Sequence, residues 1–367
     1  MSSAAIEALV HGCQEHFANP HAEDHALGWR AAEAVDRART SIASRLGAEE
    51  DEVVFTSGAT EASNIALLGI ANGGSSGRIL VSAVEHEAVL APARELGRRG
   101  HAIAEVPVGP DGTVDLDAFE SLLGPGDLLA SIMLVNNEIG TVQPIAELAA
   151  MCAARGVLLH VDAVQALGWM TLDVGALGAD MLSVSAHKVG GPKGVGALFV
   201  RREIRDRVRP IVFGGGQEGG LRPGTVPVPL CASFAAACDA LPNASEVAAW
   251  RQRTSRFAGR LVGMSPGAWV NGGGHPGNVS LTLPGVDADL LVARLRPRVA
   301  VSRGSACASG VPSHSHVLRA IGLSAADCAA TIRLSTGPGT TLLELDEAAQ
   351  AFSDAVAGLG RGIASPP

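Results

Sequence analysis

Lysine is almost absent from this chain of 367 residues. Among its 28 lysine and arginine residues only Lys188 and Lys193 are lysines, so arginine supplies nearly all of the positive charge. An arginine guanidinium stays protonated and cannot form an imine, whereas a desolvated lysine amine can. Any Schiff-base chemistry in this protein therefore depends on one of these two residues.

Paired cysteines and long apolar runs are also missing. The 6 cysteines form no CxxC pair and no set with histidines at the spacing of zinc ligands, which argues against a disulfide framework and a metal site. No run reaches the roughly 18 apolar residues of a membrane span, and the first residues do not resemble a signal peptide. We therefore expect no metal, no membrane attachment and a cytoplasmic location.

Positive charge is in deficit, whereas hydrophobic residues are abundant. The formal net charge is −9 at pH 7 and no basic patch interrupts it, so we expect no direct nucleic-acid binding. Hydrophobic residues make up 47% of the chain, enough to bury a large core. We therefore expect a folded protein and not an intrinsically disordered one.

Short apolar runs alternate with helical patterns along the first part of the chain. Apolar residues repeat at helical spacing between residues 27 and 46, and Gly47 offers a left-handed cap. Strands are predicted at 53–56, 79–82, 128–135, 157–161 and 181–185, and helices at 59–70, 87–98 and 145–154. Strands that are apolar on both faces and alternate with helices predict an α/β fold, a mostly parallel sheet flanked by helices.

The pattern changes after Thr225. We predict a large domain at 1–229 and a smaller C-terminal α+β domain at 230–367, with short strands at 279–283 and 299–302 and a mobile cysteine loop at 302–316. The first twenty residues or so either belong to the large domain or pack with the small one.

Polar residues that follow the predicted strands are the candidates for function, because parallel sheets bind ligands beyond the carboxyl ends of their strands. In FTSGATEASN (55–64), Gly58 turns the chain, and Ala59 and Thr60 open a helix whose first amides lack internal acceptors. This geometry suits a phosphate, although an ordinary N-capped helix gives the same pattern. No lysine follows, which excludes a Walker loop.

Asp162 and Lys188 each follow a strand, and Ser185 and His187 precede the lysine. A buried carboxylate needs a cationic partner. An aspartate that faces a pyridinium nitrogen and a lysine that holds an aldehyde as an imine are what pyridoxal phosphate needs, because its protonated ring is the electron sink. An ordinary ion pair is the alternative interpretation of the two residues.

Four further residues are interpreted from their surroundings. His86 is either an ordinary loop histidine or a ring that stacks on the cofactor. Cys307, in SRGSACASG, is either an incidental surface thiol or a mobile nucleophile. Arg333 is either part of a surface ion pair or a two-donor fork for a substrate carboxylate. His160, inside its strand, is interpreted as a packed histidine.

In order along the chain, these segments resemble the motifs of the cysteine desulfurases, which are pyridoxal-phosphate enzymes of fold type I in the class V aminotransferase group. The resemblance covers about residues 18–349. It rests on FTSGATEASN, VEHEAVL, LVNNEIGTVQ, HVDAVQALG, SAHKVGGPKGVG, GGGQEGGLRPGT and SRGSACASG. Each motif is weak alone, but seven in sequence order are specific.

The resemblance implies a role for each candidate residue. At the ring of pyridoxal 5'-phosphate it implies the imine lysine Lys188, the pyridine partner Asp162, the phenolic-oxygen donor Gln165 and the stacking acid–base residue His86. At the phosphate it implies Ala59, Thr60, Ser185, His187 and, from the neighbouring subunit of a homodimer, Thr225. At the substrate it implies Asn137 as a contact and Arg333 as the carboxylate anchor.

The function implied is conversion of L-cysteine to L-alanine, with the sulfur taken up by Cys307 as a persulfide. The long loop between Cys307 and Val317 resembles the branch that delivers persulfide to an acceptor protein, for iron–sulfur clusters or for tRNA or DNA thiolation. The alternatives are another pyridoxal-phosphate lyase or transaminase, such as selenocysteine lyase or a kynureninase-like enzyme, and a catalytically silent binding protein.

The chain departs from the family pattern in three places. The usual first strand and turn, of the type YLDNAATTP, have no counterpart before MSSAAIEAL. Pro223 and Arg303 stand where the family commonly has serine, which is expected to stiffen the phosphate loop and to crowd the cysteine loop. The segment STGPGTT after Arg333 lacks a second arginine.

Overall fold

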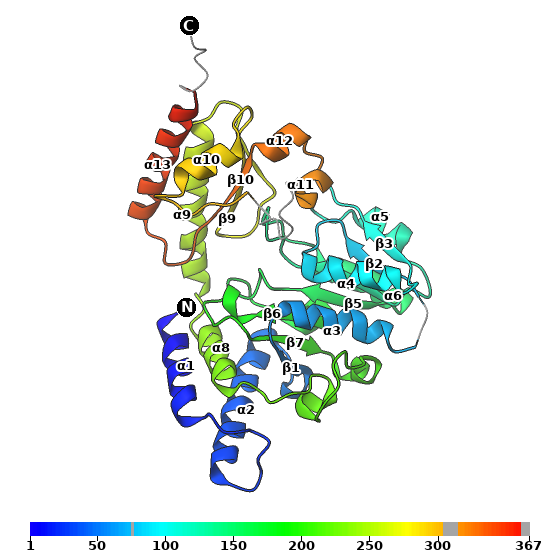
Figure 1. The fold of residues 1–367 in the computed structure, drawn as a ribbon. Helices are drawn as coiled ribbons and strands as arrows, with labels where there is room; N and C mark the ends of the chain where they lie inside the picture. The colour runs from blue at the N-terminus through cyan, green and yellow to red at the C-terminus, as the bar shows by residue number, and fades with distance from the viewer. Residues whose placement is uncertain (75–76, 304–314, 361–367) are drawn as a thin grey trace. The chain divides into compact units, whose positions relative to one another are not determined.

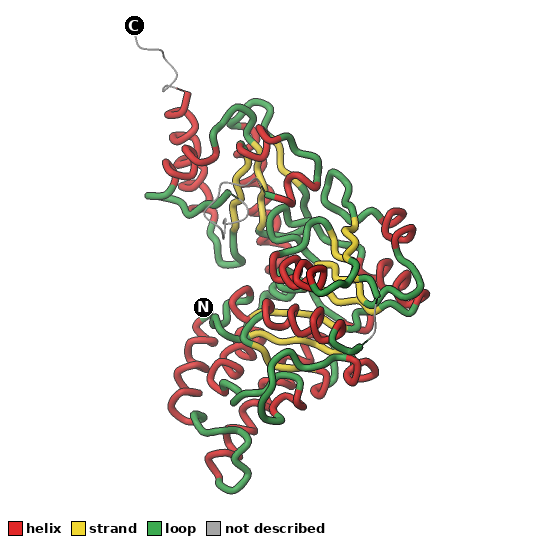
Figure 2. The backbone as a smooth tube through the Cα atoms, turned by 45° about the vertical axis from the view of Figure 1, so that its right-hand side comes forward, coloured by secondary structure: helices red, strands yellow, loops and turns green. Residues whose placement is uncertain are grey.

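The computed structural model describes residues 1–74, 77–303 and 315–360. They form two compact units, and the first comprises Met1–Val106, Asp115–Val135 and Gln143–Leu241. The second comprises Pro107–Val114, Asn136–Val142 and the described part of Pro242–Pro367. Figure 1 labels their helices and strands, and Figure 2 distinguishes them by colour.

The first unit contains a 7-stranded sheet in the order β1-β7-β6-β5-β4-β2-β3. Its strands are β1 (Val53–Thr56), β2 (Ile79–Ser82), β3 (Ile103–Val106), β4 (Leu129–Met133), β5 (Leu158–Asp162), β6 (Met181–Ser185) and β7 (Gly196–Val200). The neighbours from β6 to β3 pair in parallel, whereas β7 is antiparallel to both β6 and β1. The predicted mostly parallel α/β fold is confirmed, and β1 runs in the same direction as the parallel strands.

Helices cover the sheet because their apolar sides pack against its buried strands. The helices of this unit are α1 (Ser3–Glu15), α2 (Ala26–Leu46), α3 (Ala59–Ala71), α4 (Glu87–Arg98), α5 (Leu116–Leu122), α6 (Ile145–Arg155), α7 (Val174–Leu177) and α8 (Val228–Asp239). Short 3-10 helices lie at η1 (Glu50–Glu52), η2 (Ala186–Lys188), η3 (Arg202–Arg207) and η4 (Gln217–Gly220). The predicted cap of α2 is confirmed, since Gly47 is left-handed with φ 63°.

The crossovers decide which face each helix covers. α3 and α4 pack side by side, and residues of both join sheet residues in one buried cluster. α3 links β1 to β2 and α4 links β2 to β3, so both connections run across the sheet toward β3. α6 links β4 to β5, which is a connection in the opposite direction. Because such crossovers are right-handed, α6 packs against β5 from the other face.

The second unit contains a 3-stranded antiparallel sheet in the order β10-β9-β8. Its strands are β8 (Trp269–Asn271), β9 (Asn278–Thr282) and β10 (Thr331–Ser335), and its helices are α9 (Ala244–Gly263), α10 (Ala288–Leu295), α11 (His316–Ala320), α12 (Ala325–Ala329) and α13 (Leu342–Gly360). The strand predicted at 299–302 is wrong. Only an isolated bridge between Ser302 and Arg333 forms there, while Val299 and Val301 pack against the unit's core.

The compact units divide the chain after Leu241, whereas the sequence places the domain division between residues 229 and 230. The difference arises because α8 packs against α1 and α2 in the first unit. α1 lies close to α8, since a Cβ on Gly12 would meet the Cα of Pro229 at 2.8 Å. Within the described residues, no helix combines the length and the apolar character needed to cross a membrane.

Candidate cofactor-binding site

Four candidate segments lie where strands of the large sheet end. β1 leads into the Gly58 turn, β2 leads to His86, β5 ends at Asp162 and β6 ends at Ser185. These four strands run in one direction, so their carboxyl ends meet at the same edge of the sheet. The edge predicted to bind a ligand is therefore formed by residues of the first unit.

The turn before α3 is held against β7 and β6. A Cβ on Gly196 would lie 2.7 Å from the Cα of Gly58 and 2.6 Å from the carbonyl oxygen of Val184, so only glycine allows this approach. A Cβ on Gly58 would meet the Ser185 hydroxyl oxygen at 3.7 Å, in ordinary contact. The N-terminus of α3, with the amides of Ala59 and Thr60, therefore lies near that hydroxyl.

Ser185 and His187 lie beside the first amides of α3, and we call these residues together the phosphate cradle. The Ser185 Oγ and the His187 Nδ1 are 2.8 Å apart, in hydrogen-bond contact. Burial and the neighbouring charges of Lys188 and Lys193 lower the pKa of His187. Amides, a hydroxyl and an imidazole at a helix N-terminus are the donor set that a phosphate requires.

Asp162 supplies a buried carboxyl group at the same edge. It is 5% exposed, and its Oδ1 accepts a hydrogen bond of 3.0 Å from the Val164 N–H. Burial raises the pKa of Asp162, while the Val164 N–H and the charges of His86 and Lys188 oppose that rise. The charges of His86 and Lys188 thus favour the ionised form of Asp162. A further cation beside the carboxylate would offset more of the cost of burying its charge.

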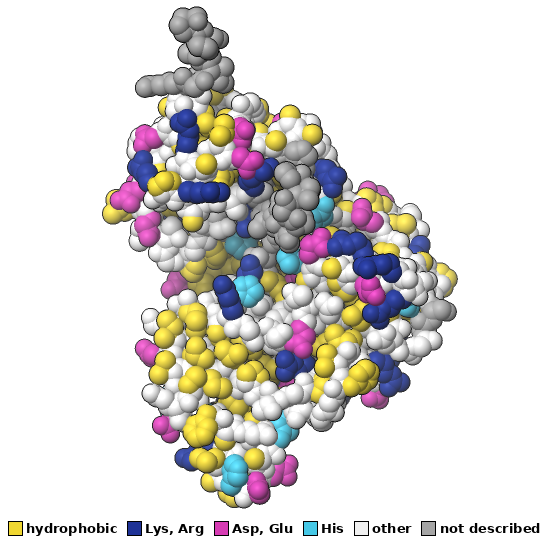
Figure 3. Space-filling model, in the orientation of Figure 1, with side chains coloured by type: hydrophobic (Ala, Val, Ile, Leu, Met, Phe, Trp, Pro, Cys, Tyr) yellow, Lys and Arg dark blue, Asp and Glu magenta, His cyan; other side chains and the backbone are white. Residues whose placement is uncertain are grey.

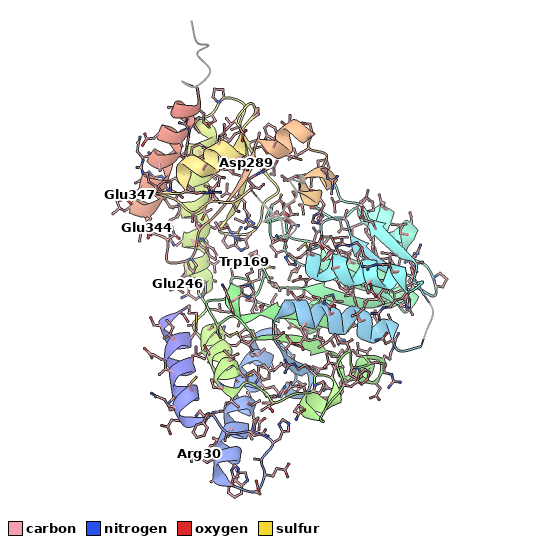
Figure 4. All side chains as sticks on the ribbon, viewed as in Figure 1. Arg30, Trp169, Glu246, Asp289, Glu344 and Glu347 are labelled. Carbon is pink, nitrogen blue, oxygen red and sulfur yellow. The ribbon has the colours of Figure 1, made fainter. Side chains whose placement is uncertain are left out.

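Lys188 ends η2 and its side chain is exposed, as is that of Lys193. The backbone of its turn lies beside the turn after β5, since a Cβ on Gly168 would meet the Lys188 carbonyl oxygen at 3.6 Å. That turn carries Gln165, whose carbonyl oxygen accepts a hydrogen bond of 2.7 Å from the Trp169 indole (Figure 4). The structure thus brings the turn that carries Gln165 to the turn that carries Lys188.

His86 caps α4 at the edge of the sheet. Its Nδ1 accepts a hydrogen bond of 3.0 Å from the Ala88 N–H, so the neutral ring carries its proton on Nε2. The preceding Glu85 is fully buried, and its Oε1 accepts hydrogen bonds from the Ser82 hydroxyl (2.6 Å) and the Met133 N–H (2.7 Å). Burial raises the pKa of Glu85 to about 8, and the charge of Asp162 also raises it.

Sequence reasoning gave no role to Glu61, yet its carboxylate joins two predicted segments. It accepts hydrogen bonds from the Ser57 N–H and, at 3.0 Å, from the Arg222 Nε. Burial raises the pKa of Glu61, but these hydrogen bonds outweigh it and the net shift is downward. The phosphate turn is thus tied to the loop that carries Thr225, whose side chain is exposed. No local pattern signals this pairing, because the two partners lie far apart in sequence.

The two predicted substrate residues lie in the second unit and are neighbours there. The Arg333 Nη1 donates to the Asn137 carbonyl oxygen at 3.0 Å, and so does the Asn278 Nδ2 at 3.0 Å. Among the described residues, the buried Nε of Arg333 has no hydrogen-bond partner. The guanidinium therefore keeps a donor for a further acceptor.

Cys307 lies outside the described residues, so its predicted place in a mobile loop remains a prediction. The described Arg303 donates to both carboxylate oxygens of Asp289 on α10, at 2.8 and 2.7 Å (Figure 4). His160 is a packed histidine, as predicted. Among the described residues, no three His, Cys, Asp or Glu side chains are placed to hold a metal ion.

Comparison with known proteins identifies the family. The chain matches the Aminotransferase class-V family over residues 2–347. It belongs to that family. Among similar sequences, a probable mitochondrial cysteine desulfurase of Dictyostelium discoideum is 40% identical over 348 residues, which are 93% of this chain and 77% of that protein. The cysteine desulfurase IscS of Rickettsia typhi is 38% identical over 350 residues, 94% of this chain and 85% of that protein.

Solved structures agree with this family membership. A NifS-like protein superposes with a TM-score of 0.90 and 31% identity, over 98% of this chain and 96% of that one. SspA in complex with cysteine superposes with a TM-score of 0.83 and 33% identity, over 93% of this chain and 97% of that one. The recognition of a cysteine desulfurase in the class V aminotransferase group is confirmed.

The cofactor of this class V family is pyridoxal 5'-phosphate, and the residues at the sheet edge fit it. The Gly58 turn packs closely on β6 and β7 because Gly196 lacks a Cβ, and this brings the start of α3 near the Ser185 hydroxyl, where a phosphate needs donors. The buried Asp162 suits a pyridinium nitrogen, and the exposed side chain of Lys188 carries the primary amine with which an aldehyde forms an imine. When bound, the cofactor supplies the electron sink of the reaction.

Proposed function

We propose that this chain is a cysteine desulfurase, which converts L-cysteine to L-alanine and receives the sulfur as a persulfide on Cys307. The observation that carries the proposal is the position of Lys188. One of only two lysines lies at the edge of the sheet, near enough to Asp162 to affect its pKa. The cysteine complex of the similar SspA supports cysteine as the substrate.

Each residue at the sheet edge receives a role in this proposal. Lys188 holds the cofactor aldehyde, Asp162 keeps the pyridine nitrogen protonated, and Gln165 donates to the phenolic oxygen. His86 stacks on the ring and transfers protons through Nε2, because its Nδ1 is engaged by Ala88. The proposed phosphate ligands are the Ala59 and Thr60 amides, Ser185 and His187.

Asn137 and Arg333 are proposed to bind the substrate. A guanidinium recognises a carboxylate with two parallel hydrogen bonds, and Arg333 retains the Nε donor for one of them. Its Nη1 is already fixed by the Asn137 carbonyl oxygen, which limits the rotation of the side chain. The arrangement supports a carboxylate anchor that is ordered before the substrate arrives.

The sulfur step is a displacement at the substrate sulfur. The thiolate of Cys307 forms the S–S bond while the C–S bond of the substrate breaks, and the carbon skeleton keeps the electron pair of the broken bond. Protonation of that carbon releases alanine and leaves the persulfide on Cys307. We propose that an acceptor protein then takes the outer sulfur, for iron–sulfur cluster assembly or for tRNA or DNA thiolation.

A homodimer is proposed because apolar side chains remain exposed in the first unit. Ile6, Val10, Phe17 and Trp29 are each 47% exposed or more, and Figure 3 shows apolar side chains gathered over the region of α1 and α8. Contiguous exposed apolar surface is typical of an interface. The exposed Thr225 is proposed to contact the cofactor phosphate of the partner subunit.

A reducing compartment such as the cytoplasm is proposed because the sulfur step needs a free thiol. The cysteines of the described residues are free, and Cys152, Cys231, Cys238 and Cys328 are buried. Burial raises the pKa of Cys152 and of Cys238 to about 12, which keeps these thiols protonated and unreactive. They do not compete with Cys307 for sulfur.

The two lysines provide a matched test of the proposal. In the full chain with added pyridoxal phosphate and a thiol reductant, which releases the persulfide sulfur as sulfide, Lys188→Ala is expected to lose the borohydride-reducible adduct and the release of alanine and sulfide from L-cysteine. Lys193→Ala, an exposed lysine five positions on, is expected to keep both. Cys307→Ala is expected to keep the adduct and to lose desulfuration.

Three results would contradict the proposal. An adduct that survives Lys188→Ala would assign the imine elsewhere. Cysteine turnover retained by Cys307→Ala would exclude the persulfide route. A wild-type chain that stays colourless with pyridoxal phosphate would be a silent member of the family.

A further inference from the structure

A chain of buried hydrogen bonds crosses the large sheet. The His160 ring on β5 contacts the Ser131 hydroxyl on β4 through Nδ1 and the Ser183 hydroxyl on β6 through Nε2, each at 2.8 Å. Ser63 on α3 lies 3.4 Å from Ser183, between their hydroxyl oxygens. All four residues are 0% exposed. One imidazole thus links three neighbouring strands, and a weaker contact continues to the helix above them.

This series of hydrogen bonds lies directly beneath the proposed cofactor site. His160 precedes Asp162 by two residues on β5, and Ser183 precedes Ser185 by two on β6. Side chains two apart on a strand share a face of the sheet, so the chain lies one pleat below Asp162 and Ser185. Asp162 and Ser183 are also register partners across the two strands.

His160 is neutral in this position. Burial lowers the pKa of His160 to about 3, so the ring carries one proton at the pH of any ordinary assay. A neutral imidazole offers one donor and one acceptor, and each serine hydroxyl can serve as either. Both ring nitrogens can therefore be satisfied at once. The ring is suited to hold two serines at a fixed separation and not to exchange protons.

We propose that His160 is a positioning residue for the cofactor. Together with the backbone pairing of β5 and β6, its contact with Ser183 holds the two strand ends in place, and with them the separation of Asp162 from Ser185. The inference rests on the proposed function, in which these two residues bind the pyridine nitrogen and the phosphate. The cofactor is a rigid molecule, so a change in their separation weakens one contact or the other.

The test separates positioning from stability. His160→Phe keeps an aromatic ring but leaves two buried hydroxyls without this partner, so it is expected to weaken both stability and cofactor binding. The triple variant combines His160→Phe with Ser131→Ala and Ser183→Ala. It no longer contains the two hydroxyls that lost their partner, so its stability against urea is expected to recover. We expect the affinity of the triple variant for pyridoxal phosphate to stay about tenfold weaker, as when residues that orient a ligand are lost.

The readouts are the dissociation constant of pyridoxal phosphate and the visible absorbance of the bound cofactor at several pH values. Asp162 is proposed to keep the pyridine nitrogen protonated. The pH dependence of that absorbance is therefore expected to shift in the triple variant. Ser233→Ala is the matched control, since its buried hydroxyl donates to the Ala5 carbonyl oxygen at 2.6 Å, outside the chain of hydrogen bonds. It is expected to bind the cofactor as the wild type does.

A triple variant that is stable and binds the cofactor with wild-type affinity and absorbance would overturn the positioning role. A triple variant and a control that lose affinity equally would overturn it as well. A wild-type chain that binds no pyridoxal phosphate would instead overturn the proposed function. The wild-type measurement therefore distinguishes the two failures.

Discussion

Replacing Gly196 by alanine tests the geometry of the phosphate cradle. The added Cβ would lie 2.6 Å from the Val184 carbonyl oxygen and 2.7 Å from the Gly58 Cα. Both neighbours are backbone atoms, so no flexible side chain can relieve the contact. The strand pairs of β7 with β1 and β6, or the Gly58 turn itself, must move.

The expected loss of unfolding free energy is that of an overpacked core, about 1–3 kcal/mol. The Gly58 turn is the more exposed of the two neighbours, so part of the movement is expected there. Displacement of this turn shifts the first amides of α3 away from the Ser185 hydroxyl. We therefore expect Gly196→Ala to weaken the binding of pyridoxal phosphate together with stability.

Urea unfolding and a titration with pyridoxal phosphate measure the two effects. The control is Gly259→Ala on α9, an exposed helical glycine with no atom within 4 Å of the added Cβ. That substitution is expected to stabilise the protein by about 0.5–1 kcal/mol, because alanine favours the helix. A Gly196→Ala variant with the stability and cofactor affinity of the wild type would refute the reasoning.

Two further predictions concern single residues. Burial raises the pKa of Glu85 from its ordinary value of 4.5 to about 8 and so favours the protonated acid in the folded state. The stability that this group contributes is present below pH 4.5 and is lost as the pH rises toward 8. Glu85→Gln is therefore expected to lose less stability between pH 5 and pH 8 than the wild type in urea unfolding, and an equal loss would contradict the assignment. Asn243 caps α9 by accepting hydrogen bonds from the Ser245 and Glu246 amides, so Asn243→Ala is expected to lower the unfolding free energy by about 1 kcal/mol. An unchanged unfolding midpoint would show that this cap contributes nothing.

Local sequence patterns predicted most of the large sheet and its helices. The runs that became β1, β2 and β6 have the predicted bounds, because apolar residues between glycine and polar turns specify a buried strand. The same patterns predicted neither β3 nor β7, and β7 is the strand that runs antiparallel to its neighbours. Residues 186–195 link β6 to β7, too few for the crossover that a parallel strand needs, so the length of this connection was the available signal.

The strand predicted at 299–302 failed for a different reason. Val299 and Val301 have the composition of a strand, but a strand also needs a partner along its length. Only Ser302 finds one, in Arg333, and the two valines pack against the core of the second unit instead. Pairing is a long-range property, so composition alone overestimated the sheet.

The sequence by itself determined which chemistry is available to this protein. Imine formation depends on residue type, so two lysines in the whole chain leave two candidates, and strand and turn patterns place Lys188 at a strand end. Only the tertiary structure decided what surrounds these groups. The burial of Asp162, the pairing of Glu61 with Arg222 and the link from Ser131 through His160 to Ser183 join residues far apart in the chain. Such distances follow from strand order and register, which arise when the whole sheet assembles.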